Sequence, residues 1–157
     1  SVDTRPPWTR ADLYVHLQSL ESKLTAEILD YEAHTERAIQ RLDPCVRGLV
    51  ASVSRVVKAI YPTSRVSTYG SVATGMWLPS SDVDLVVEDP PNSSLYVIHA
   101  ADRLDAIANA MQDEPWATTI NVLHTARIPV LKLTAQQPGA PVLNVDITIG
   151  QPATSAE

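Results

Sequence analysis

Residues 69–87 read YGSVATGMWLPSSDVDLVV, and this stretch decides the fold class. It joins a short alternating segment, residues 65–69, through a run of small residues to an apolar segment over residues 82–88 that contains two aspartates. Aspartate is disfavoured in strands, so two of them in an otherwise apolar strand indicate a functional site. Because a strand repeats every two residues, Asp82 and Asp84 are predicted to share one face. The opposite, packed face is formed by Val83, Leu85 and Val87.

A second segment, residues 142–149, shows the same alternation, with Asp146 opposite the face of Val145, Ile147 and Ile149. If Asp82, Asp84 and Asp146 converge on one sheet face, they repel one another and, unless some are protonated, need a compensating cation. Hard oxygen ligands without a cysteine cluster favour Mg²⁺ or Mn²⁺ over zinc. Two such ions can stabilise the attacking and leaving oxygens in phosphoryl or nucleotidyl transfer. Eleven aspartates in 157 residues make an Asp-x-Asp pair common by chance, so its strand setting matters more than the pair itself.

The small residues between the two segments, Gly70 to Gly75, predict a loop that lets backbone N–H groups and two hydroxyls approach a phosphate. The run matches the first half of a P-loop, but Met76 and Trp77 stand where Lys-Ser/Thr is required, so a P-loop NTPase is excluded. No Gly-x-Gly-x-x-Gly is present, which excludes a dinucleotide-binding fingerprint. The alternative for the two glycines is a pair of tight turns.

The rest of the chain predicts an α+β fold with a mixed or antiparallel sheet of about five strands. The predicted order is two helices, two strands, one helix and three strands. An apolar stripe predicts a first helix over residues 10–41, and Asp43-Pro44 is typical of a helix start, so a second helix is expected from there to Tyr61. A third helix is predicted over 94–112, and the final strands over 119–125, 128–134 and 142–149.

The first helix is unusually long for a small domain. About 30 residues extend about 45 Å, so we expect the helix to bend, to break near Ala33–Thr35, or to reach something outside this chain. The expected organisation is an irregular arm over 1–10, the long helix over 11–42, a catalytic domain over 43–150 and a tail over 151–157.

The composition and net charge of the chain limit the kinds of partner it can bind. The chain has 45% hydrophobic and 19% charged residues and one cysteine, Cys45, so no internal disulfide can form. Twelve Lys and Arg against eighteen Asp and Glu give a net charge of −6, the wrong sign for gripping nucleic acid by the surface field alone. A polyanionic substrate would need a local basic groove, a metal ion or a second, basic domain. No apolar run is long enough to span a membrane, so no membrane partner is expected.

Taken together, Gly70-Ser71, ten intervening residues, Asp82-x-Asp84 and the later Asp146 resemble the DNA polymerase β-type nucleotidyltransferase superfamily. The string 69–87 is most similar to the non-canonical poly(A) polymerases and terminal uridylyltransferases, which extend RNA 3′ ends without a template. Residues 126–132 and Tyr61-Pro62 resemble further segments of that family. The resemblance covers about residues 20–150 and implies the polymerase β-like palm fold.

The resemblance implies that Asp82, Asp84 and Asp146 hold two Mg²⁺ or Mn²⁺ ions, with Asp146 also helping to activate the 3′-hydroxyl. It implies that Gly70 and Ser71 cradle the triphosphate of a nucleoside triphosphate, with Ser81 near its end and Thr74 as a weaker candidate. Lys132, on the strand before Asp146, is interpreted as a charge at the edge of the core. Ile149 and Gly150 depart from the family, which often has an aromatic residue and then asparagine there.

The implied function is the transfer of AMP from ATP to the 3′ end of an RNA, in the nucleus. In the family a helical domain follows the third acid and selects the base, whereas this sequence ends eleven residues after Asp146. We therefore expect a catalytic half whose long helix packs on a helical domain absent from this chain, and whose RNA is bound by basic residues there. The alternatives are a nucleotidyltransferase acting on a non-RNA acceptor and a non-catalytic nucleotide-binding module.

Overall fold

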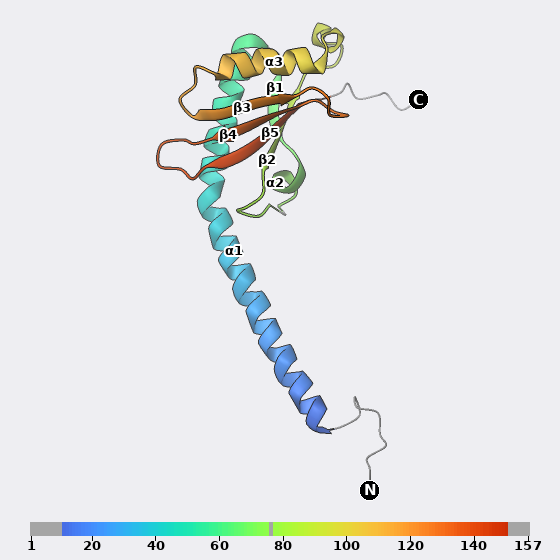
Figure 1. Cartoon of the computed structure of the whole chain (residues 1–157), viewed down its shortest axis with the longest axis vertical. Helices are drawn as coiled ribbons and strands as arrows, with labels where there is room; N and C mark the ends of the chain where they lie inside the picture. The colour runs from blue at the N-terminus through green and yellow to red at the C-terminus, as the bar shows by residue number, and fades with distance from the viewer. Residues whose placement is uncertain (1–10, 76, 151–157) are drawn as a thin grey trace, which may run out of the picture. The chain divides into compact units, whose positions relative to one another are not determined.

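The computed structural model describes residues 11–75 and 77–150, with side chains from residue 17 onward (Figure 1). The predicted arm over 1–10, the tail over 151–157 and Met76 lie outside the described residues. The helices and strands, in chain order, are α1 (Ala11–Ile60), β1 (Arg65–Thr68), α2 (Gly70–Thr74), β2 (Val83–Glu88), the 3₁₀ helix η2 (Ser94–Val97), α3 (Ala100–Met111), β3 (Ala117–Leu123), β4 (Val130–Ala135) and β5 (Leu143–Ile149). This content confirms the predicted α+β class.

The predicted start of a second helix at Asp43-Pro44 is wrong, because α1 runs without interruption through Pro44. A proline inside a helix removes one backbone hydrogen bond. The helix nevertheless continues because its apolar face continues: Ile39, Leu42, Val46, Leu49 and Val53 keep helical spacing across the proline and pack into the core. The break considered near Ala33–Thr35 is also absent from the structure.

The sheet has the strand order β1-β2-β5-β4-β3, which confirms the predicted mixed sheet of five strands. β2 and β5 are parallel, whereas the other neighbouring strands are antiparallel. β5, the last strand along the chain, therefore lies in the middle of the sheet between β2 and β4.

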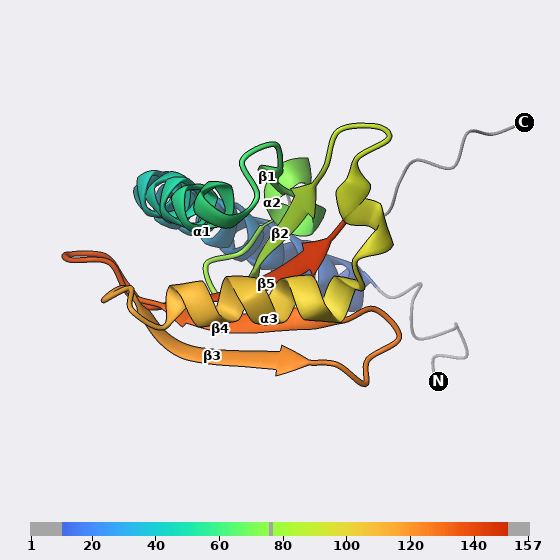
Figure 2. The ribbon, with the colours of Figure 1, turned by 90° about the horizontal axis from the view of Figure 1, so that it is seen from above.

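A single hydrophobic core covers one face of this sheet. Every second residue of β2 and β5 is buried, while the residues between them are half-buried or exposed. The buried side chains of α1 and α3 join the same core, and Figure 2 shows α3 running along β3 and β4. The opposite face carries Asp84 and Asp146, and it is not covered by this core.

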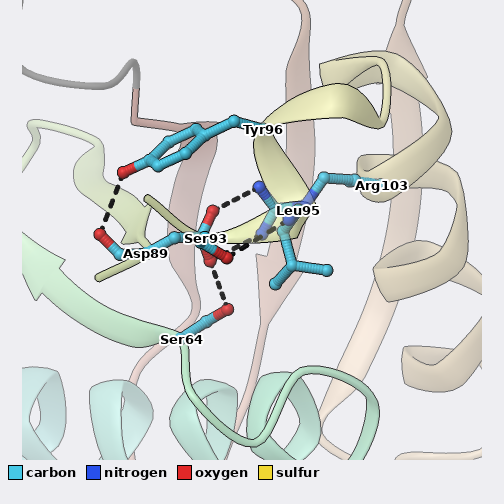
Figure 3. A network of polar contacts seen from close by, with 6 residues as sticks. All are labelled: Ser64, Asp89, Ser93, Leu95, Tyr96 and Arg103. Atoms are coloured by element: carbon cyan, nitrogen blue, oxygen red, sulfur yellow. Dashed lines mark hydrogen bonds and ion pairs between the residues drawn. The ribbon is translucent and has the colours of Figure 1, made fainter. Parts of the chain in front are cut away.

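A buried polar network fixes the C-terminal end of β2 (Figure 3). Asp89, which follows β2, accepts hydrogen bonds from Arg103 of α3 at 2.5 and 3.0 Å and from Ser64 Oγ at 2.5 Å. The Tyr96 hydroxyl donates to the Asp89 carbonyl at 2.9 Å, and the Arg103 guanidinium lies 4.9 Å from the centre of the Tyr61 ring. The network thus ties the strand that carries Asp84 to α3, to η2 and to the turn after α1.

The chain divides into two compact units, residues up to Ala38 and residues from Ile39. The described part of the first unit is the N-terminal part of α1, as the apolar stripe predicted. Its large apolar side chains are exposed, from 48% at Leu17 to 65% at Tyr31. Among the described residues, no helix combines the length and the apolar character needed to cross a membrane.

Candidate active site

The structure brings Asp84, Asp146 and Lys132 into one row across three neighbouring strands. Asp84 of β2 is the register partner of Asp146 in β5, and Asp146 is the register partner of Lys132 in β4. Neighbouring strands lie about 4.7–4.9 Å apart, so the three side chains are immediate neighbours on the face away from the core. The row exists because β5 occupies the middle of the sheet.

The third predicted acid, Asp82, is exposed and lies just before β2. The pKa of Asp84 is raised above its ordinary value, chiefly by burial and then by the negative charges of Asp146 and Asp82, while Lys132 opposes the rise. Ionising Asp84 is therefore disfavoured by its burial and by the two neighbouring carboxylates.

Lys132 provides the positive charge of this row. Its Nζ donates to both carboxylate oxygens of Asp146, at 2.9 and 2.7 Å. The pKa of Lys132 is raised, first by the hydrogen bond to Asp146 and also by the charges of Asp146, Asp82 and Asp84, against the opposing effect of burial. The interpretation of Lys132 as a charge at the edge of the core missed this contact. The antiparallel pairing of residues 130–135 with 143–149 is the signal that could have placed Lys132 opposite Asp146.

The donor chemistry of the acids suits a hard divalent cation, because every candidate ligand is a carboxylate oxygen and the carboxylates repel one another. Within residues 11–75 and 77–150, however, no three His, Cys, Asp or Glu side chains are arranged to hold a metal ion. Asp146 instead faces Lys132 with both oxygens. The residue types fit Mg²⁺ or Mn²⁺, and an ion held by both Asp146 oxygens would take the place of Lys132.

Gly70 packs directly against Asp84. Its φ is +63°, and a Cβ at this position would lie 2.6 Å from Asp84 Oδ2. The backbone N–H of Tyr69 also donates to the Asp84 carbonyl at 3.0 Å. Only glycine fits this corner without moving the carboxylate, which explains the glycine at position 70 in physical terms.

The predicted phosphate loop after Gly70 is instead the short helix α2, closed by Gly75 in the left-handed conformation at φ +73°. Ser71 is half-buried at its start. The Thr74 hydroxyl donates to the carbonyls of Gly70 and Ser71 at 3.0 and 3.3 Å, so it serves the helix itself. Ser81 is half-buried, and its carbonyl accepts a hydrogen bond from Trp77 Nε1 at 3.2 Å. Of the predicted nucleotide-binding residues, Gly70 is therefore the one whose contact with a candidate metal-binding acid, Asp84, is described.

A pocket of about 420 Å³ continues the acidic face along the strands. Val86 and Thr148, two residues beyond Asp84 and Asp146, line this pocket together with Tyr69, Arg127 and Ile128. Its volume lies in the range of small-molecule sites. A larger cavity of about 600 Å³, lined by Ser52, Trp116 and Gln137 among others, does not include the acids.

This mixed five-stranded sheet, which carries Asp84, Asp146 and Lys132 on its open face, has the fold of nucleotidyltransferase palm domains. Residues 20–155 match the family described as "Poly(A) RNA polymerase, mitochondrial-like, central palm domain", and the chain belongs to that family.

Curated relatives share this region. Poly(A) RNA polymerase protein 2 of Saccharomyces cerevisiae is 24% identical over 148 residues, which cover 94% of this chain and 24% of the relative. The inactive non-canonical poly(A) RNA polymerase protein Trf4-2 of Drosophila melanogaster is 36% identical over 93 residues, 57% of this chain and 21% of the relative. The chain thus spans about a quarter of the length of these relatives or less.

Solved structures share the fold. The structure of the GLD-2/RNP-8 complex superimposes with a TM-score of 0.67 at 20% identity, covering 82% of this chain and 44% of that one. The polymerase core of TRAMP, an RNA surveillance complex, has a TM-score of 0.54 at 24% identity, covering 69% of this chain and 32% of that one. Both likenesses concern the palm.

Proposed function

We propose that this chain is the catalytic palm of an RNA nucleotidyltransferase that transfers AMP from ATP to the 3′-hydroxyl of an RNA without a template. The observation that carries the proposal is the pairing of Asp84 with Asp146 on the open face of the sheet, with Gly70 packed against Asp84. Membership of the poly(A) RNA polymerase palm family supports it.

In this proposal, Asp82, Asp84 and Asp146 bind two Mg²⁺ or Mn²⁺ ions. The bound ions supply charge stabilisation for the attacking and leaving oxygens. Gly70 and Ser71 hold the triphosphate at the start of α2, with Ser81 and Thr74 as the further candidates.

Asp146 orients and activates the 3′-hydroxyl. The 3′-hydroxyl oxygen of the RNA forms a bond to the α-phosphorus of ATP, the bond from that phosphorus to the oxygen bridging to the β-phosphate breaks, and pyrophosphate leaves. The hydroxyl proton passes toward the Asp146 carboxylate, which must first be released by Lys132. The chain therefore contributes both the acids and Lys132, which forms hydrogen bonds to one of them, Asp146.

Base selection and most RNA contacts are assigned, in this proposal, to a helical domain outside this sequence. The net charge of −6 supports a second, basic surface for the RNA. The exposed apolar side chains of Leu17, Leu20, Leu24 and Ile28 are the part of α1 proposed to pack on that domain. A nuclear site of action is proposed from the resemblance of residues 69–87 alone.

The test has two parts, one with the full-length protein and one with this chain. Full-length wild type should extend a labelled RNA oligonucleotide with ATP in Mg²⁺, and Asp84→Ala should abolish extension with an unchanged circular dichroism spectrum. This chain should bind a non-hydrolysable ATP analogue in a Mg²⁺-dependent manner, and Asp82→Ala/Asp84→Ala should lose that dependence. Asp113→Ala, an exposed acid after α3, is the matched control. Equal Mg²⁺-dependent binding by wild type and double variant would refute the metal site.

Two alternatives remain distinguishable. Transfer of AMP to a protein or small molecule, with no extension of RNA, would favour a nucleotidyltransferase with another acceptor. The Drosophila relative is described as inactive, so a non-catalytic nucleotide-binding module is the second candidate. Metal-dependent nucleotide binding without turnover in the full-length protein, unchanged by supplying other acceptors, would favour that module.

A further inference from the structure

We propose that Lys132 is the resident counter-cation of the three acids and competes with divalent metal for Asp146. The inference rests on the proposed function, because it takes Asp82, Asp84 and Asp146 as the metal-binding residues. It adds a residue that sets how tightly the site binds its ions.

The contact geometry supports direct competition. Lys132 Nζ lies 2.9 Å from one Asp146 oxygen and 2.7 Å from the other, so it occupies the position between the two oxygens. A metal ion held by both oxygens takes that same position. An ion held by one oxygen would lie beside an ammonium group, and the two cations repel each other.

The surroundings of Lys132 support its role as a counter-cation. Asp146 lies between Asp84 and Lys132 in the row, and Asp82 comes two residues before Asp84. In the described part of the chain, Lys132 is the cation that forms an ion pair with one of these acids, Asp146. The charges of all three acids act on Lys132. Because Lys132 balances part of the negative charge, the folded chain can hold these acids together without metal. The same positive charge lowers the affinity of the acids for metal.

Lys132 also has the freedom to leave. Its side chain is 47% exposed, against 22% for Asp146, and a lysine ammonium sits on a flexible four-carbon stem. The ammonium can therefore exchange Asp146 for solvent without an unpaired charge being buried. Replacing Lys132 by a metal ion at Asp146 therefore needs the rearrangement of a single side chain, that of Lys132.

The experiment measures Mn²⁺ binding to this chain by the electron paramagnetic resonance signal of free Mn²⁺. Lys132→Met, which keeps the length and removes the charge, should bind Mn²⁺ about tenfold more tightly than wild type. Lys132→Gln keeps a donor to Asp146 without the charge and should behave like Lys132→Met, which preserves the test if the methionine variant does not fold. Lys132→Arg keeps the charge and should bind as wild type does. Lys23→Met removes an exposed lysine from the other compact unit and serves as the matched control.

A second readout uses thermal unfolding in EDTA. Lys132→Met should lower the Tm by about 2–4 °C, because the acids lose their balancing charge. Adding Asp146→Asn to that variant should recover most of the loss, because one of the repelling charges is removed.

The outcomes separate this inference from the proposed function. If Asp84→Asn weakens Mn²⁺ binding but Lys132→Met and Lys132→Gln bind no more tightly than wild type, the metal site stands and the competition is refuted. If Asp84→Asn leaves Mn²⁺ binding unchanged, the metal site fails and the inference falls with it. Tighter binding by both uncharged variants, and wild-type binding by Lys132→Arg and Lys23→Met, would establish it.

Discussion

Asp84 lies at the centre of the candidate site: Gly70 packs on its carboxylate, and Asp146 is its register partner in the neighbouring strand β5. Its raised pKa means that ionising Asp84 is harder in the folded chain than in the unfolded chain. Folding stability from this group is therefore present below the ordinary carboxyl pKa of 3.8 and is lost as the pH rises through the raised value.

Asp84→Asn should consequently raise the Tm of the chain in EDTA at pH 7, since it removes a charge that the fold disfavours. The advantage over wild type should shrink as the pH is lowered toward 3.8, where the carboxyl is protonated. Thermal unfolding followed by circular dichroism between these pH values checks both statements, with Asp113→Asn as the control. A variant less stable than wild type at every pH would contradict the assignment.

Gly70→Ala tests the close approach at the corner before α2. The new Cβ would meet Asp84 Oδ2 at 2.6 Å and would hold a positive φ, so we expect a loss of about 1–3 kcal/mol in the free energy of unfolding and weaker Mn²⁺ binding. Gly139→Ala is the matched control, because Gly139 has φ +74° but open space around the same atom. It should lose about 1–2 kcal/mol and bind Mn²⁺ as wild type does. Equal Mn²⁺ affinities in the two variants would disprove a role for the contact with Asp84.

At the scale of elements, the Arg103–Asp89 pair fastens α3 to the end of β2. Both side chains are almost fully buried, at 1% and 0% exposure, so removing one partner leaves the other unpaired inside the protein. Arg103→Met or Asp89→Asn should each lower the free energy of unfolding by about 3–5 kcal/mol in urea titrations. Arg55→Met breaks the exposed pair with Glu114 and should shift the midpoint far less. Similar shifts for the buried and the exposed pair would argue against this anchoring role.

The elements that follow a simple period were predictable from the sequence. The two-residue alternation gave the buried face of β2 and β5 correctly, because one side of each strand packs on a core and the other does not. The predicted division of α1 at Asp43-Pro44 is wrong because the apolar face continues past this local start signal, and tertiary packing overrides such signals.

The alternation gave the face of each aspartate within its own strand and led to the hypothesis that Asp84 and Asp146 converge, but it did not reveal the role of Lys132. That role depends on which strands are neighbours, and the insertion of β5 between β2 and β4 is a long-range choice. α2 was missed because five residues are too few for helical periodicity to show.

At the scale of the whole molecule, α1 has two different kinds of apolar residue. Leu20 and Leu24 are 52% and 58% exposed, whereas Leu49 and Val53 are buried in the core. In this chain, Leu20→Gln/Leu24→Gln should change the free energy of unfolding by no more than about 0.5 kcal/mol, while Leu49→Ala should lower it by about 2–5 kcal/mol.

In the full-length protein, the same Leu20→Gln/Leu24→Gln pair should lower the Tm clearly if a further domain covers these side chains. Scanning calorimetry of both forms provides the comparison. An unchanged Tm in the full-length protein would refute the proposal that the N-terminal part of α1 packs on a helical domain.

The position of β5 has a consequence for how the protein is made. β1 pairs with β2 and β3 pairs with β4, each between strands that are adjacent in the sequence, so these two pairs can assemble from local contacts while a nascent chain leaves the ribosome. β5 is the last of the five strands to emerge, and it is the strand that joins the two pairs. The carboxylates of Asp84 and Asp146 therefore become neighbours only after β5 has been synthesised. Shorter nascent chains do not contain the repulsion between these two carboxylates.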